Sequence, residues 1–134
     1  MKTYLLDTNI LSAIIRKEAF AEQCFRQAVA DDDVLLLSIV VFYEVKRGLL
    51  KRDAKKQTAV FEQLVNQFAW CDVIQEDWIH AARLRVERTK IGRSIEDADL
   101  LIAAQATRLD AILVTDNEKD FTDLGVQVEN WRRR

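Results

Sequence analysis

Four acidic residues stand where a carboxylate would be unfavourable unless something binds it. Asp7 and Asp116 each follow a short apolar run, and Glu44 and Asp99 each lie within an apolar stretch of helical spacing. Carboxylate oxygens are the ligands that Mg²⁺ and Mn²⁺ prefer, and such ions activate water and polarise a phosphodiester. The four acids therefore predict a divalent-cation site that hydrolyses a phosphate ester.

The elements that would position these acids follow from the hydrophobic pattern. We expect strands at 3–6, 34–37, 71–74, 111–114 and 126–128, and helices at 9–17, 19–30, 39–50, 53–68, 76–90 and 95–108, with Ser38 capping the third helix. Continuous apolar strands that alternate with helices indicate an α/β fold with a mostly parallel sheet of four to five strands. Ligands of such sheets bind beyond the carboxyl ends of the strands, where Asp7 and Asp116 stand.

The composition predicts a single soluble domain over residues 1–134. The chain is 49% hydrophobic and 31% charged, with a formal net charge of −2, so bulk charge does not indicate nucleic-acid binding. No apolar stretch is long enough to cross a membrane, and a strand follows Met1–Thr3 without a signal peptide. Cys24 and Cys71 form no CxxC pair, which favours the reducing cytoplasm.

Basic residues gather in three places despite the negative net charge. The groups are Lys46, Arg47, Lys51, Arg52, Lys55 and Lys56; then Arg83, Arg85, Arg88, Lys90 and Arg93; then Arg132, Arg133 and Arg134. A solvated helix face explains any one of them, and contact with phosphates is the alternative. Beside an acidic site, such groups indicate a nucleic-acid substrate, and we expect Arg47, Lys51 and Arg93 to contact its backbone.

Two of the acids have structural explanations that stay open. Asp7 could cap the helix that follows it, a role compatible with a site at the sheet edge. Glu44 has apolar neighbours one turn back and Gly48 one turn ahead, so it needs a partner. That partner is either a metal or metal-bound water, or Arg47 in a salt bridge.

The segment that contains Asp99 is the strongest single motif. Ser94 to Asp97 predicts a capping box at the start of a helix that continues as an apolar run. Asp97 and Asp99 diverge by about 200° on a helix, so they should not both face one site. We expect Asp99 to face the site and Asp97 to act as a cap or a supporting acid.

Other catalytic classes lack their residues. His80 is the only histidine, which argues against histidine-based ribonucleases and Ser-His-Asp triads. The chain has no GxGxxG, no GxxxxGK[ST] and no His/Cys set suited to zinc.

Taken in order, the acidic motifs resemble those of the PIN-domain ribonucleases, specifically the VapC toxins of bacterial toxin–antitoxin pairs. The matching pieces are Leu6–Asn9, Glu44, Asp99–Ala104, Thr115–Asn117 with Asp120–Phe121, and the ending Val128–Trp131. The resemblance covers nearly the whole chain.

This resemblance implies a three-layer α/β/α sandwich and a Mg²⁺- or Mn²⁺-dependent endoribonuclease that cleaves cellular RNA, often tRNA or rRNA. It implies Asp7, Glu44 and Asp99 as catalytic and metal-binding acids. We expect Asp116 as the fourth, with Thr8, Asn9, Asp97, Thr115, Asn117 and Asp120 in support. It further implies a homodimer and a cognate antitoxin, with DNA bound only through the antitoxin.

Three other classes compete with this interpretation. A haloacid dehalogenase-type phosphatase needs a second Asp where Asn9 stands, and a receiver domain needs an acid pair near the first strand. A non-catalytic PIN-like module that binds RNA or protein would not need Asp7, Glu44 and Asp99 together.

Overall fold

The molecule is built around one parallel sheet. The computed structural model describes residues 1–133 of the chain. The strands lie in the order β3-β2-β1-β4-β5, and every neighbouring pair is parallel. The strands are β1 (Thr3–Leu6), β2 (Val34–Ser38), β3 (Ala69–Cys71), β4 (Ile112–Val114) and β5 (Val128–Glu129). The predicted α/β class with a parallel sheet is therefore confirmed.

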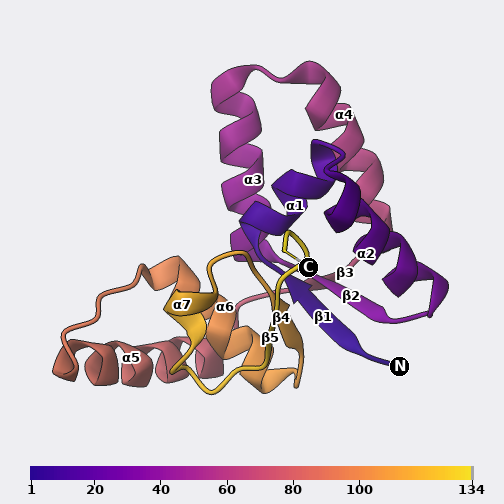
Figure 1. Ribbon diagram of the computed structural model, residues 1–134. Coiled ribbons are helices and arrows are strands. Elements are labelled where there is room, and N and C mark those ends of the chain that lie inside the picture. Colours follow the sequence, from indigo (N-terminus) through magenta and orange to yellow (C-terminus); the bar gives the residue numbers. More distant parts are fainter. Residues whose placement is uncertain (134) are drawn as a thin grey trace.

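Helices cover both faces of this sheet, which gives three layers. They are α1 (Thr8–Ile15), α2 (Ala19–Ala30), α3 (Ile39–Arg52), α4 (Lys55–Leu64), α5 (Gln75–Lys90), α6 (Asp97–Arg108) and α7 (Glu118–Phe121), with a 3₁₀ turn at Val65–Gln67. Figure 1 shows α1 to α4 together on one side of the strands and α5 to α7 on the other. Among the described residues, no helix is long and apolar enough to cross a membrane.

The core lies on both sides of β1 and its neighbours. Leu5, Leu6 and Leu113 are fully inaccessible, and Leu37 is nearly so. A strand buried on both faces has no polar side to expose, which is why these strands are continuous apolar runs in the sequence. The first polar residues after each run are thereby placed at one edge of the sheet.

That edge is where the predicted acids meet. Strand β1 pairs with β4 so that Leu6 lies opposite Val114, and the backbone N–H of Asp7 donates to the Val114 carbonyl at 2.8 Å. On the other side of β1, β2 ends at Ser38, whose hydroxyl accepts from Val40 N–H and begins α3. Asp7 and the start of the Glu44 helix therefore lie at the same end of the sheet.

Two predicted boundaries are wrong. The third strand is Ala69–Cys71 and not 71–74, because Val73 and Ile74 instead form the turn that leads into α5. The predicted capping box at Ser94 is absent: α6 begins at Asp97, with Glu96 in the cap position and no side-chain cap bond. Ile95 is buried, and the extended chain that places it in the core delays the helix.

The other differences are smaller. The predicted helix 53–68 begins at Lys55, because Asp53 adopts a left-handed conformation (φ 47°) that separates α3 from α4. The last strand is Val128–Glu129 rather than 126–128. Of the C-terminal arginines, Arg134 lies outside the described residues.

Candidate active site

Asp7 is buried at the sheet edge and is held by hydroxyl and amide donors. Its Oδ1 accepts from Thr8 N–H at 2.8 Å, so it caps α1, and its Oδ2 accepts from the Thr115 hydroxyl at 2.8 Å. Burial raises the pKa of Asp7; the two hydrogen bonds oppose that rise, and the charge of Glu44 adds to it. Thr115 and Thr8 thus orient the carboxylate without neutralising it.

Glu44 is joined to the same turn by a single hydroxyl. The Thr8 Oγ1 donates to its Oε1 at 2.7 Å, across 36 residues of sequence. The alternative partner, Arg47, points elsewhere and lies over the ring of Tyr43 at 5.3 Å. Glu44 is half-buried and faces the sheet edge. Because Arg47 points elsewhere, Glu44 has no cation beside it within the described chain.

Asp99 completes a group of acids that repel one another. It is half-buried in the first turn of α6. Burial, then the charges of Asp7, Glu44, Glu96 and Asp120, raise its pKa to about 7. Acids at the start of α1, in α3, at the start of α6 and in α7 thus act on Asp99 across the edge of the sheet.

Asp97 is not part of this group. It is exposed, and its Oδ1 accepts from Arg85 at 2.6 Å on the outer side of α6. The predicted divergence of Asp97 and Asp99 is what the helix shows, because their neighbours differ completely. The structure therefore does not support Asp97 as a supporting acid of the site.

In the last acidic cluster, Asn117 and Asp120 lie on the side of the site, and Asp116 lies apart from them. Asn117 donates from its amide to Asp120 Oδ2 at 2.6 Å, and its own N–H donates to the Thr115 hydroxyl at 3.0 Å. Through Thr115 this chain of bonds reaches Asp7. Asp120 is half-buried, and its charge acts on Asp99.

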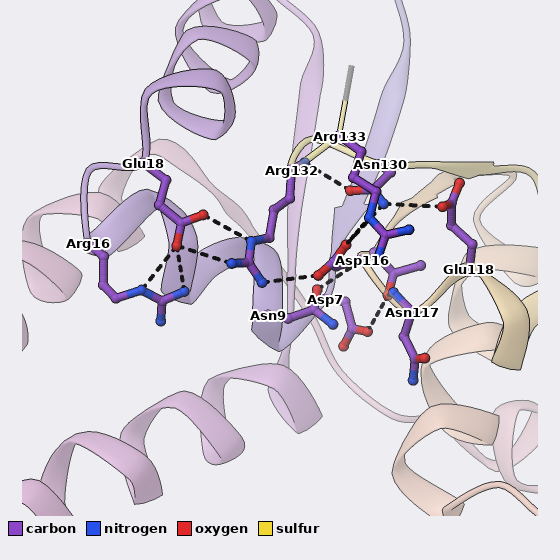
Figure 2. Close-up of polar contacts among 11 residues, drawn as sticks. Asp7, Asn9, Arg16, Glu18, Asp116, Asn117, Glu118, Asn130, Arg132 and Arg133 are labelled. Atoms are coloured by element: carbon purple, nitrogen blue, oxygen red, sulfur yellow. Dashed lines mark hydrogen bonds and ion pairs between the residues drawn. The ribbon is translucent and has the colours of Figure 1, made fainter.

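Asp116 is placed differently from our expectation that it would be the fourth ligand. Its Oδ2 accepts from Arg132 at 3.0 Å, and its Oδ1 accepts from the Asn130 amide at 3.1 Å and lies 3.5 Å from Arg133 Nε. Figure 2 shows Arg132 between Asp116 and Glu18, joining both. Positive partners thus occupy both oxygens of Asp116.

Asn9 has a structural role beside Asp116. Its Oδ1 accepts the Asp116 N–H at 3.1 Å and so ties the start of α1 to the loop after β4 (Figure 2). A phosphatase of the haloacid dehalogenase type needs a carboxylic acid at this position. The amide here serves as a backbone anchor instead.

The residues expected to contact nucleic acid are spread over the surface. Arg47 and Lys51 are exposed on α3, with Arg47 resting on Tyr43. Arg93 instead forms an ion pair with Asp123 at 2.8 Å and donates to the Lys119 carbonyl at 3.3 Å. Arg93 is therefore already engaged within the chain.

Sequence reasoning missed the arginines that hold the last acidic cluster. Arg88 is buried, donates to the Asp120 carbonyl and leaves its Nε without a partner within the described chain. Arg132 belongs to a C-terminal basic cluster in the sequence, for which we weighed a solvated surface against phosphate contact and predicted no contact with an acid. A signal was present in both cases, since each arginine lies near an apolar anchor in sequence: Leu84 for Arg88 and Trp131 for Arg132.

The donor set fits a hard divalent cation. Asp7, Glu44 and Asp99 offer only oxygen ligands, and the hydrogen-bond partners of Asp7 and Glu44 within residues 1–133 are hydroxyl and amide groups rather than cations. No three acidic, histidine or cysteine side chains of the described chain lie close enough to ligate one ion together. This suits Mg²⁺, which takes one or two carboxylates and keeps several waters, better than the expected three or four direct ligands.

A second surface feature lies on α3. Ile39, Tyr43 and Leu50 are exposed, and together with Phe42 they line a groove of about 730 Å³. The basic side chains at its border are Lys46, Arg47 and Lys51. Exposed apolar surface of this kind is typical of contacts with other proteins.

Comparisons with known proteins identify the family of the chain. Residues 4–126 match the PIN domain family. Ribonuclease VapC2 of Rickettsia felis is 29% identical over 130 residues, which cover 96% of this chain and 97% of that protein. The tRNA(fMet)-specific endonuclease VapC of Shigella flexneri is 28% identical over 134 residues, which cover 98% of this chain and 99% of the relative.

The fold is shared with a solved complex. The crystal structure of VapBC2 from Rickettsia felis bound to a DNA fragment from their promoter contains a chain that superposes with a TM-score of 0.86. The two chains are 27% identical, and the match covers 96% of this chain and 98% of the other.

Proposed function

The chain belongs to the PIN-domain family and is a ribonuclease of the VapC toxin type, and from this premise we propose that Asp7, Glu44, Asp99 and Asp120 form a metal-dependent endoribonuclease site. We propose that residues 1–134 act as one PIN domain in the cytoplasm. Asp116, expected as the fourth acid, is excluded from the proposed site because arginines neutralise it.

The observation that carries the proposal is a concentration of negative charge without a compensating cation. Desolvation and four neighbouring acids raise the pKa of Asp99 to about 7. Buried charges are normally paired or bound to a metal. A bound Mg²⁺ or Mn²⁺ would supply the compensating positive charge, polarise the phosphodiester and lower the pKa of a bound water.

The chain's own residues supply orientation and charge. Thr115 and Thr8 donate to Asp7, which fixes its two oxygens at the sheet edge. Thr8 also donates to Glu44, so one threonine sets the separation of two acids. Asp7 and Asp99 are the proposed direct ligands, while Glu44 and Asp120 would orient the attacking water and accept its proton.

We propose a structured cellular RNA as the substrate, and we favour tRNA over rRNA. The support is the tRNA(fMet)-specific relative from Shigella flexneri, which matches along nearly the full length of both chains. The exposed Arg47 and Lys51 of α3 are the proposed phosphate contacts. Arg93 is left out because it is bound to Asp123.

We further propose a cognate antitoxin and a homodimer. The relative from Rickettsia felis is found in a VapBC2 complex on promoter DNA, and we infer that this chain reaches DNA only through such a partner. The exposed apolar side chains on α3 and those on α5 (Trp78, Ile79 and Val86) are surfaces that these contacts would cover.

The proposal is tested by cleavage of a total-RNA and tRNA pool with Mg²⁺, with Mn²⁺ and with EDTA. Asp97→Asn is the matched control for Asp99→Asn, because both change an acid to an amide in the first turn of α6. We expect metal-dependent cuts from the natural chain and Asp97→Asn, and none from Asp99→Asn. Cuts in EDTA would contradict the proposal, and RNA retained without cleavage would favour a non-catalytic module.

A further inference from the structure

Arginines contact Asp116 and Asp120, the two acids of the last cluster, through different groups. Arg132 and Arg133 approach the carboxylate of Asp116. Arg88 approaches Asp120 only through its backbone carbonyl. The result is that the Asp116 carboxylate has cationic partners, while the Asp120 carboxylate has none within the described chain.

The C-terminal segment is built to hold Asp116. Trp131 is buried and packs edge-on against Tyr4 with ring centroids 5.2 Å apart, which anchors the segment. Arg132 then donates to Asp116 and, with Nε at 3.0 Å, to Glu18 in the turn between α1 and α2. Figure 2 shows this bridge, with Asn130 on the other oxygen of Asp116.

Asp120 lies in α7, and this short helix is held through its backbone carbonyls. Arg88 is buried and donates to the Asp120 carbonyl, and Arg93 donates to the Lys119 carbonyl and pairs with Asp123. These are the carbonyls near the end of α7, which a four-residue helix cannot satisfy by itself. The Asp120 carboxylate accepts only from the Asn117 amide within the described chain.

We propose that these arginines select Asp120 over Asp116 as the fourth carboxylate of the metal site. Arg132 and Arg133 are positioning residues that neutralise Asp116. Arg88 and Arg93 are positioning residues that fix Asp120 and leave its carboxylate free. This inference rests on the proposed metal site, and it concerns which acids contribute to it.

The register between β1 and β4 places Asp116 close enough to Asp7 to compete with Asp120 for the cation. Leu6 pairs with Val114, so Asp7 lies beside Thr115, and Asp116 is one residue further along. An unpaired carboxylate at that distance would attract a cation held by Asp7, because charges interact strongly near a poorly solvated site. The arginine bridge removes that attraction.

The test is direct binding of Mn²⁺ to the purified full-length chain, followed by electron paramagnetic resonance of free Mn²⁺. We expect Asp120→Asn to weaken binding about tenfold, the scale for groups that support a metal site. We expect Asp116→Asn to leave binding unchanged. Arg26→Gln, which breaks an exposed pair with Glu22 on α2, is the control for loss of an arginine.

The decisive comparison changes the arginine background. In a chain carrying Arg132→Gln and Arg133→Gln, Asp116 keeps only the Asn130 amide, and Asp116→Asn should now weaken Mn²⁺ binding. In the natural chain it should not. Equal weakening by Asp116→Asn in both backgrounds, or no weakening in either, would overturn the selection.

The other arginine pair is tested by Arg88→Met against Arg88→Lys. We expect Met to weaken Mn²⁺ binding and Lys, which can still donate to the Asp120 carbonyl, to restore part of it. If Arg88→Met fails to fold, Arg93→Gln tests the same support from an exposed position. Unchanged binding in the folded variants would contradict the role of this pair.

Failure of the selection can be told from failure of the metal site. Asp99→Asn must abolish Mn²⁺ binding if the proposed site exists. Should Asp99→Asn bind Mn²⁺ like the natural chain, the proposed function fails. Should it lose binding while Asp116 and Asp120 variants behave alike, only the selection fails.

Discussion

Two buried aspartates show how the same side chain serves different purposes. Asp77, which is 1% exposed, accepts two bonds from Arg108 at 2.9 and 3.0 Å and a third from Ile74 N–H. Asp7, which is 5% exposed, receives only hydroxyl and amide donors and faces Glu44 and Asp99.

The difference separates structural acids from functional ones. Asp77 joins α5 to the end of α6, and its charge is matched where it lies. Asp7 lies among acids: the charge of Glu44 raises the pKa of Asp7, the charges of Asp7 and Glu44 raise that of Asp99, and no cation within the described chain offsets them. A buried acid with a cation partner therefore indicates a structural role, and a group of acids without a cation partner indicates a site for a ligand.

Breaking the Asp77 pair should have the largest energetic effect. Arg108→Met leaves Asp77 buried and uncompensated, which should lower the free energy of unfolding by about 3 kcal/mol, the low end for such pairs because Arg108 is partly exposed. Urea unfolding measures this loss. RNA cleavage per folded molecule should remain, and its loss would mean that the two regions are coupled.

Removing an acid of the site should affect activity rather than stability. Asp7→Asn should lower kcat/KM by about 10²–10³-fold, the scale for a lost electrostatic contact in catalysis. Its thermal unfolding temperature should stay the same or rise, because repulsion with Glu44 and Asp99 is relieved. A marked fall in that temperature would place Asp7 with Asp77, as a structural acid.

The acidic site should also make stability depend on pH through Asp99. The Asp99 carboxyl titrates near 7 in the folded chain and near 4 when unfolded, so the folded state holds the proton more tightly. Without metal, the contribution of Asp99 to stability should therefore fall as pH rises from about 4 to about 7, and Asp99→Asn should remove this contribution from the pH dependence. Melts over this range measure it, and an unchanged slope in the variant would contradict the assignment.

The smallest effect is expected at the exposed acid of α6. Asp97→Asn removes an exposed pair with Arg85, and such pairs contribute about 0–1 kcal/mol. Neither the unfolding temperature nor RNA cleavage should change appreciably. A large loss of cleavage would bring Asp97 into the site after all.

The sheet and three of the acids follow from the sequence because they depend on local patterns. Continuous apolar runs predict buried parallel strands, and the polar residue after each run falls at the sheet edge. Helical geometry alone separates Asp97 from Asp99. These features need no knowledge of distant contacts.

The fourth acid could not be chosen from the sequence because distant residues decide it. Arg132 reaches Asp116 from the C-terminal segment, and Arg88 reaches the Asp120 carbonyl across 32 residues. The start of α6 was misplaced for a similar reason, since burial of Ile95 outweighs the cap that Ser94 could offer. Tertiary contacts overrode a local signal in both cases.

The central claim is that buried acids without a cation form a metal site, and thermal melts with increasing Mn²⁺ test it most directly. A ligand that binds only the folded state raises stability by about 2.7 kcal/mol at one hundred times its Kd. We predict that Mn²⁺ raises the unfolding temperature of the natural chain and of Arg108→Met, but not that of Asp99→Asn. An equal rise in Asp99→Asn would contradict the account.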